Sequence, residues 1–144
     1  MDTSDKVFGK KDKYESPAIK NYTAAKKAFD EGDYSESLRL QTFAFCIDPD
    51  FTPTYELAVL TLEKLGAHDE ASLFKNAITD FNNYKPFYDL GHHFINADNY
   101  RMAIPFLQRS LILSRNSLGV AMELAIAYTA QFQPEKGMEL LKRI

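Results

Sequence analysis

The feature that most constrains the fold is a helical pattern whose punctuation recurs along the chain. Ser16-Pro17 has the form of an N-cap followed by proline, Thr52-Pro53 and Gln133-Pro134 look alike, and Lys85-Pro86 is a weaker copy. Such pairs favour the first turn of a helix, because proline lacks only an N–H group that has no partner there. They predict helices that begin near residues 17, 53, 86 and 134.

Short turn signals lie between these openings. The segments Glu31–Tyr34, Leu65–His68 and Ala97–Tyr100 place Gly, Asp or Asn where a helix can end in a left-handed residue. No alternation of apolar and polar residues is long enough for a strand. The sequence therefore predicts an all-α chain of roughly eight helices, joined in pairs by about three residues each.

The spacing and the small residues resemble a known repeat. Units that begin at Ala18, Thr52, Tyr84 and Leu118 are 34, 32 and 34 residues apart. The tetratricopeptide repeat (TPR) has a period of about 34 residues, with small residues where its two helices cross and an aromatic residue after the turn. The third unit matches best, at Phe87, Leu90, Gly91, Phe94, Tyr100, Ala103, Leu107, Ser110 and Leu111. The first unit departs from the pattern at Asn21 and Gln41.

The resemblance implies a right-handed α-α superhelix, a TPR solenoid of about four helix-turn-helix repeats. Residues 17–144 would form the TPR domain, while residues 1–16 lack apolar periodicity and are expected to be a flexible N-terminal tail. The repeats would span about 18–51, 52–83, 84–117 and 118–144, the last one incomplete.

In this family the first helix of each unit lines a concave wall that binds peptides. The resemblance assigns such a groove to Tyr22, Lys26, Phe29, Leu57, Leu60, Lys85, Tyr88, His92, Ile95, Met122 and Ile126. This wall is apolar and aromatic, which suits a peptide that presents hydrophobic anchors. Of the residues with which some TPR proteins clamp a terminal carboxylate only Lys85 is present, so we expect no such clamp. Arg109 is expected on the outer face.

Chemistry-bearing motifs are missing from the sequence. It has no Gly-rich phosphate loop, no Gly-x-Ser-x-Gly and no His-Glu-x-x-His, so we expect neither an enzyme nor a bound cofactor. His92 and His93 project about 100° apart on a helix and cannot both ligate one metal ion. Cys46 is expected to be a small buried hydrophobe. Pro105 falls about one turn inside a predicted helix, where it removes a hydrogen bond at a cost of up to about 3 kcal/mol.

Composition excludes several classes of partner. The chain has 17 basic and 20 acidic residues, a net charge of −3, which gives no electrostatic reason to bind nucleic acid. It has neither a membrane-length apolar run nor a signal-peptide core at its N-terminus. A single cysteine fits a reducing compartment. We expect a cytoplasmic protein that binds neither nucleic acid nor membranes.

Three functions stay open at this stage. The first is a non-catalytic protein–protein interaction module that binds a partner peptide in its concave apolar groove. The second is a chaperone that resembles the small TPR chaperones of type III secretion, and the third is the N-terminal regulatory TPR part of a larger enzyme. The sequence stops at Ile144 inside the last repeat without a capping helix. This predicts either a longer array or a homo-oligomer formed through the uncapped C-terminal end.

Overall fold

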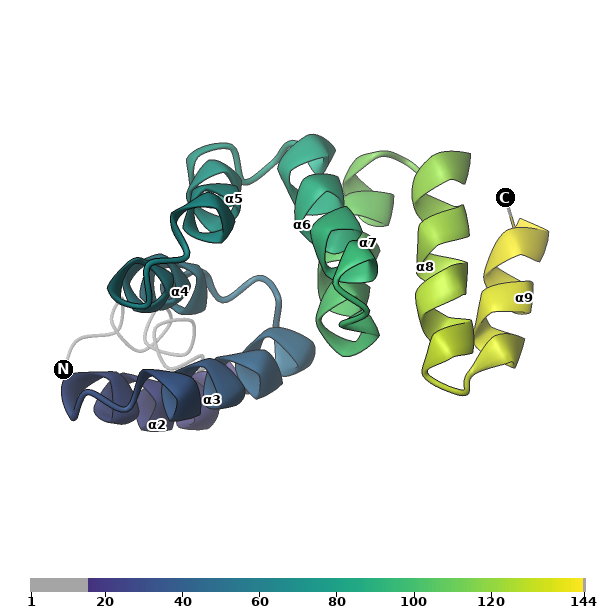
Figure 1. Ribbon diagram of the computed structural model, residues 1–144. Coiled ribbons are helices and arrows are strands. Elements are labelled where there is room, and N and C mark those ends of the chain that lie inside the picture. The colour runs from purple at the N-terminus through teal and green to yellow at the C-terminus, as the bar shows by residue number, and fades with distance from the viewer. Residues whose placement is uncertain (1–15, 144) are drawn as a thin grey trace, which may run out of the picture.

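The computed structural model describes residues 16–143, so the predicted tail lies, except for Ser16, outside the described residues. Within this range the chain forms eight helices and no strand (Figure 1). In chain order they are α2 (Ile19–Asp30), α3 (Tyr34–Ile47), α4 (Thr52–Lys64), α5 (His68–Thr79), α6 (Tyr84–Asn96), α7 (Tyr100–Leu113), α8 (Leu118–Ala130) and α9 (Pro134–Arg143). The predicted all-α class is confirmed.

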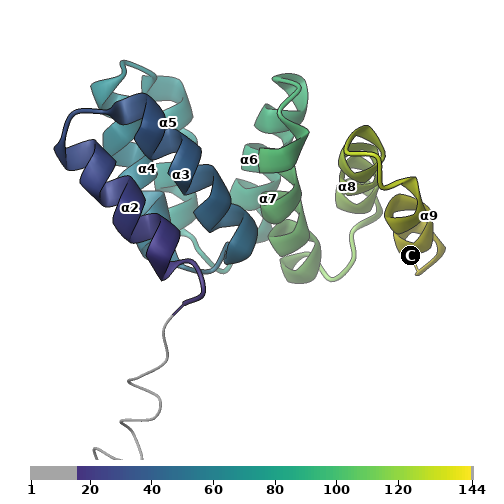
Figure 2. The same cartoon turned by 90° about the horizontal axis from the view of Figure 1, so that it is seen from below.

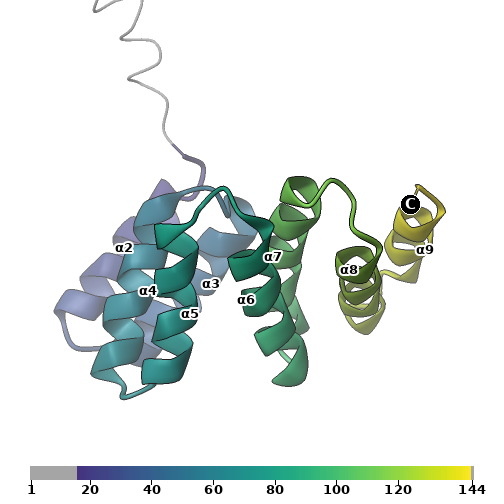
Figure 3. The same cartoon turned by 90° about the horizontal axis from the view of Figure 1, so that it is seen from above.

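Neighbouring helices pack as pairs. The pairs α2–α3, α4–α5, α6–α7 and α8–α9 are each joined by three residues, as predicted. Figures 2 and 3 show α2 to α5 gathered at one end of the molecule and α8–α9 at the other, with α6–α7 between them. The two ends of this row of hairpins therefore present different helices to solvent.

The four turns inside these hairpins share one backbone geometry. Gly32, Gly66, Asp98 and Phe132 are left-handed, with φ values of 82°, 80°, 58° and 61°. In each turn the amide of the following residue donates to the carbonyl five positions earlier, at 2.8–2.9 Å. This pattern caps a helix C-terminus and satisfies carbonyl groups that the helix leaves free. The turns recur 34, 32 and 34 residues apart, the spacings found in the sequence.

Two predicted helix starts are each displaced by two residues. α2 begins at Ile19 and not at residue 17, because the Ser16 hydroxyl accepts the amide N–H two positions on (3.0 Å) and forms a turn ahead of the helix. α6 begins at Tyr84, because the side chain of Asn83 caps it by accepting the N–H of the residue two positions on (3.0 Å). Pro86 thus falls inside the first turn, where its missing N–H costs nothing.

A cluster of aromatic side chains fills the middle of the molecule. Phe45, Tyr55, Phe74, Phe87 and Phe106 come from five successive helices, α3 to α7, and are each at most 2% exposed. The Phe45 ring centroid lies 4.9 Å from that of Tyr55 and 5.1 Å from that of Phe106. No Cα atoms of α4 and α6 lie within 8 Å of each other, whereas those of α3 and α7 do. Large rings therefore bridge the second and third hairpins, at the place where the sequence spacing shortens to 32 residues.

Gln41, one of the two positions of the first unit that differ from the TPR pattern, cross-links three helices. Its Nε2 donates to the hydroxyls of Ser37 (2.9 Å) and Thr61 (3.0 Å), and Ser37 in turn donates to the carbonyl of Ala25 (2.8 Å). All four residues are at most 1% exposed. The amide nitrogen of this buried side chain is satisfied by the two hydroxyls, whereas its Oε1 has no hydrogen-bond partner among the described residues.

The prediction that Cys46 is buried is wrong. Cys46 is exposed, because it lies about 100° around α3 from the core residue Phe45. The prediction that Pro105 lies about one turn inside a helix is confirmed, since α7 runs through it from Tyr100 to Leu113. Proline at 105 leaves the carbonyl of Arg101 without its helical donor, and the Cys46 thiol lies 3.8 Å from that oxygen as a weak donor.

Arg109 is also misplaced by the sequence analysis, because it is not an outer-face residue. Its side chain is only 13% exposed, and its guanidinium lies 3.9 Å from the centroid of the Phe81 ring. It donates to the carbonyl of Phe81 (2.8 Å) and to the carboxylate of Asp50 (2.5 Å). These bonds tie α7 to the loops that precede α4 and α6.

Candidate partner-binding face

One of the predicted groove residues offers no surface to a partner. Leu57 is 2% exposed, because α4 is buried on most of its circumference. Leu60, one turn further along the same helix, is 49% exposed and is the accessible apolar side chain of α4. On α8, Met122 and Ile126 are each 52% exposed. All four first helices of the hairpins thus present accessible predicted residues, and on α2 the exposed one is the charged Lys26.

The predicted residues of α2 are engaged in local contacts. Tyr22 packs edge-to-face on Phe51 (centroids 5.5 Å apart), and Phe29 packs on Tyr34 (5.4 Å). The Lys26 ammonium lies 2.9 Å from the carboxylate of Asp30 on the same helix. Lys85 of α6 is paired in the same way, 2.6 Å from Asp89. Both predicted lysines have a carboxylate partner on their own helix, so the two pairs add no net charge to the face.

A shared carboxylate joins α6 to α8. The Tyr88 hydroxyl donates to Glu123, and His92 Nδ1 lies 2.9 Å from Glu123 Oε1. The rings of Tyr88 and His92 stack, with centroids 5.6 Å apart and planes inclined by 18°. The hydrogen bond to the carboxylate raises the pKa of Tyr88 to about 12. Glu123 therefore fixes the orientation of two predicted groove residues.

The two adjacent histidines face different helices. While His92 contacts Glu123 of α8, His93 Nε2 lies 3.1 Å from Glu70 Oε1 of α5. Nowhere in residues 16–143 do three or more His, Cys, Asp or Glu side chains converge in a way that could hold a metal ion. Ile95, the last predicted residue of α6, is half-buried against the core.

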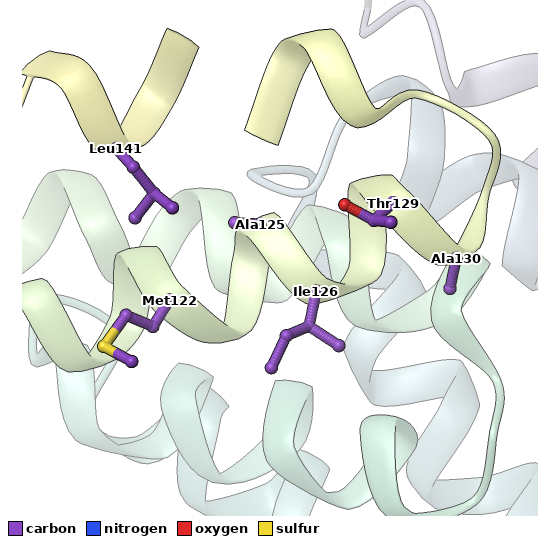
Figure 4. Close-up of a pocket in the computed structure, with 6 residues that line it drawn as sticks. All are labelled: Met122, Ala125, Ile126, Thr129, Ala130 and Leu141. Atoms are coloured by element: carbon purple, nitrogen blue, oxygen red, sulfur yellow. The ribbon is translucent and has the colours of Figure 1, made fainter. Parts of the chain in front are cut away.

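An apolar cavity opens on α8 and α9. Its volume is about 510 Å³, and six residues line it: Met122, Ala125, Ile126, Thr129, Ala130 and Leu141 (Figure 4). Two of them, Met122 and Ile126, were assigned to the groove from the sequence. Figure 4 shows Leu141 pointing from α9 toward the α8 side chains. The Thr129 hydroxyl is the one hydrogen-bonding side-chain group in this lining, so the cavity suits a hydrocarbon or aromatic group.

Two residues of this region were missed by the sequence analysis. Leu141 is 41% exposed on α9, a second helix, and the resemblance assigned only first helices to the groove. Phe132 is 92% exposed in the turn between α8 and α9. A signal for Phe132 was present, because a phenylalanine stands between Gln131 and Gln133 where the other turns carry Gly or Asp.

Comparison with known proteins assigns no family. No protein-family model matches the chain, and no curated protein is similar to it at a significant level. Among the described residues, none of the helices combines the length and the apolar character needed to cross a membrane.

Proposed function

We propose that the chain is a TPR-like, non-catalytic protein-interaction module that binds an apolar segment of a partner protein along the first helices of its hairpins. The accessible residues of this face are Leu60, Tyr88, His92, Met122 and Ile126. The observation that carries the proposal is the cavity of about 510 Å³ at the α8 end of this row, which can receive a large apolar side chain of a bound peptide.

Internal regularity supports the TPR part of the proposal. The four turns share left-handed geometry at spacings of 34, 32 and 34 residues. Gly91 stands where α6 and α7 cross, and a Cβ atom there would lie 2.4 Å from Leu107. A small residue at a helix crossing is the pattern on which the resemblance rests.

The rigidity of the face favours binding. Tyr88 and His92 are held by Glu123, so these side chains lose little conformational freedom when a partner docks on them. Aromatic groups with a polar tip are also the side chains in which binding energy concentrates. A partner anchor in the cavity and a second contact on Tyr88 would together span α6 and α8.

A peptide selection tests this function. Peptides selected from a random displayed library on the full chain should bind Leu60→Asp and Ile126→Asp at least about 10-fold more weakly than wild type. Ile112→Asp is the matched control: Ile112 is 76% exposed on α7, a second helix, and its replacement should leave the affinity unchanged. Selected peptides that bind all three variants as well as wild type would contradict the proposal.

A further inference from the structure

The C-terminal hairpin carries an unusual exposed aromatic residue beside the apolar cavity. Phe132 is 92% exposed, the largest exposed fraction among the large hydrophobic residues described. Its φ of 61° is unfavourable for a bulky side chain, and equivalent positions in two other turns are glycines. Among residues 16–143, no contact buries this side chain to offset that conformation. The feature is explained if Phe132 is buried against another molecule.

The cavity and Phe132 are a complementary pair on the same hairpin. Phe132 stands two residues after Ala130 of α8, which lines the cavity together with Thr129. A volume of about 510 Å³ exceeds that of a phenylalanine side chain. A chain that displays both a knob and a hole at one end can pair with a second copy of itself, since each copy supplies what the other receives.

Charges on α9 match an antiparallel arrangement of two copies. On the exposed stripe of this helix, Met138 (62% exposed) lies between Glu135, three residues before it, and Lys142, four residues after it. The other charged residues of α9, Lys136, Glu139 and Arg143, line a separate hollow toward α7. Under a two-fold axis beside Met138, Glu135 of each copy faces Lys142 of the other.

The same axis brings the knob to the hole. Phe132 precedes Met138 along the hairpin, so in an antiparallel copy it lies beyond the axis, on the side of the residues that follow Met138. Leu141, which follows Met138 by three residues and lines the cavity together with Met122 of α8, lies on that side. One symmetry operation thus satisfies both the apolar contact and the ion pairs.

The opposite end of the molecule is unsuited to cover the cavity of another copy. α2 exposes Lys20, Lys26 and Lys27, so a head-to-tail copy would bury lysines against an apolar lining. We infer that two copies of the chain associate through their α8–α9 hairpins about a two-fold axis, with Phe132 of each copy in the cavity of the other. The inference rests on the proposed function, because a second copy and a partner peptide then compete for one cavity.

The test is the mass of the chain in solution across a concentration series. Analytical ultracentrifugation without peptide should show a reversible equilibrium between the 16.4 kDa chain and a species of twice that mass. Phe132→Gly should raise the dissociation constant by at least about 30-fold, as for an interface hot spot. Because glycine accepts a left-handed φ, this variant should melt no lower than wild-type monomer. Leu65→Ser is the control. Leu65 also lies in a hairpin turn and is 47% exposed, and its replacement should leave the mass distribution unchanged.

A charge exchange tests the orientation. Glu135→Lys and Lys142→Glu should each weaken the dimer roughly 10-fold, and the double variant should restore it, since the pairs are reversed on both copies. Lys136→Glu, on the other face of α9, is the matched control and should have no effect. A chain that stays monomeric at about 1 mM, a dimer indifferent to Phe132→Gly, or growth into open filaments would overturn the inference. Monomers that bind selected peptides would refute only the dimer, whereas a dimer without peptide binding would refute only the proposed function.

Discussion

Gly91 offers the sharpest test of how the hairpins pack. A Cβ atom at this position would lie 2.4 Å from both Cγ and Cδ2 of Leu107, whereas ordinary contacts begin at 3.4 Å. Leu107 is 0% exposed, so either its side chain or the whole of α7 must move by about 1 Å in Gly91→Ala. Such overpacking costs about 1–3 kcal/mol, and the better helix propensity of alanine offsets about 1 kcal/mol of this cost. We expect a net loss of up to about 2 kcal/mol.

Gly119→Ala is the matched control for this change. Gly119 also lies in a first helix, but the nearest atom to its added Cβ is the Ser117 hydroxyl at 3.9 Å. This variant should be unchanged or stabilised by up to about 1 kcal/mol. Urea denaturation followed by far-UV circular dichroism should therefore separate the two variants by about 1–3 kcal/mol. Equal free energies of unfolding would refute the close approach of α6 and α7 at Gly91.

A double variant identifies Leu107 as the clashing group. Leu107→Ala alone should cost about 2–5 kcal/mol by leaving a cavity. Adding Gly91→Ala to it places a methyl group in the vacated space, so the double variant should be more stable than the sum of the single effects predicts, by about 0.5–3 kcal/mol. Strict additivity would place the strain elsewhere.

Further predictions concern side chains with unusual surroundings. Arg109→Ala should lower the free energy of unfolding by about 1–3 kcal/mol, measured in urea, because it removes the stacking on Phe81 and two hydrogen bonds. The hydrogen bond that Tyr88 donates to Glu123 raises the pKa of this tyrosine from 10.0 to about 12. The contribution of this bond to the free energy of unfolding is therefore complete below pH 10 and is lost as the pH rises through 12. In an ultraviolet titration, Glu123→Gln should shift the ionisation of the Tyr88 phenol to lower pH. Partial desolvation raises the pKa of the Cys46 thiol, so iodoacetamide should alkylate it more slowly than glutathione at neutral pH.

Features that depend on local sequence could be predicted well. The left-handed turns at Gly32, Gly66 and Asp98 follow from residue types that tolerate a positive φ, and the helices between them follow from apolar spacing. Gly91 could be placed at a helix crossing because a small residue recurs there. These signals lie within one or two turns of chain, so no tertiary information is needed to interpret them.

Features that depend on how helices rotate against one another could not be predicted. Leu57 was assigned to the groove, but the second hairpin meets the third through aromatic rings, and α4 is turned so that Leu57 is buried and Leu60 is exposed. The role of Glu123 depends on the distance from α8 to Tyr88, 35 positions earlier in the chain. Leu141 lines the cavity only because the end of α9 folds back over α8.

The central claim is that a partner docks on the first helices of the hairpins, and methyl NMR tests it most directly. Titration of the methyl-labelled chain with a selected peptide should shift the methyl signals of Leu60, Met122 and Ile126. The signals of Ile47 and Ile112, which are 48% and 76% exposed on second helices, should stay unchanged. Shifts confined to Ile47 and Ile112 would place the partner on the other face and contradict the account.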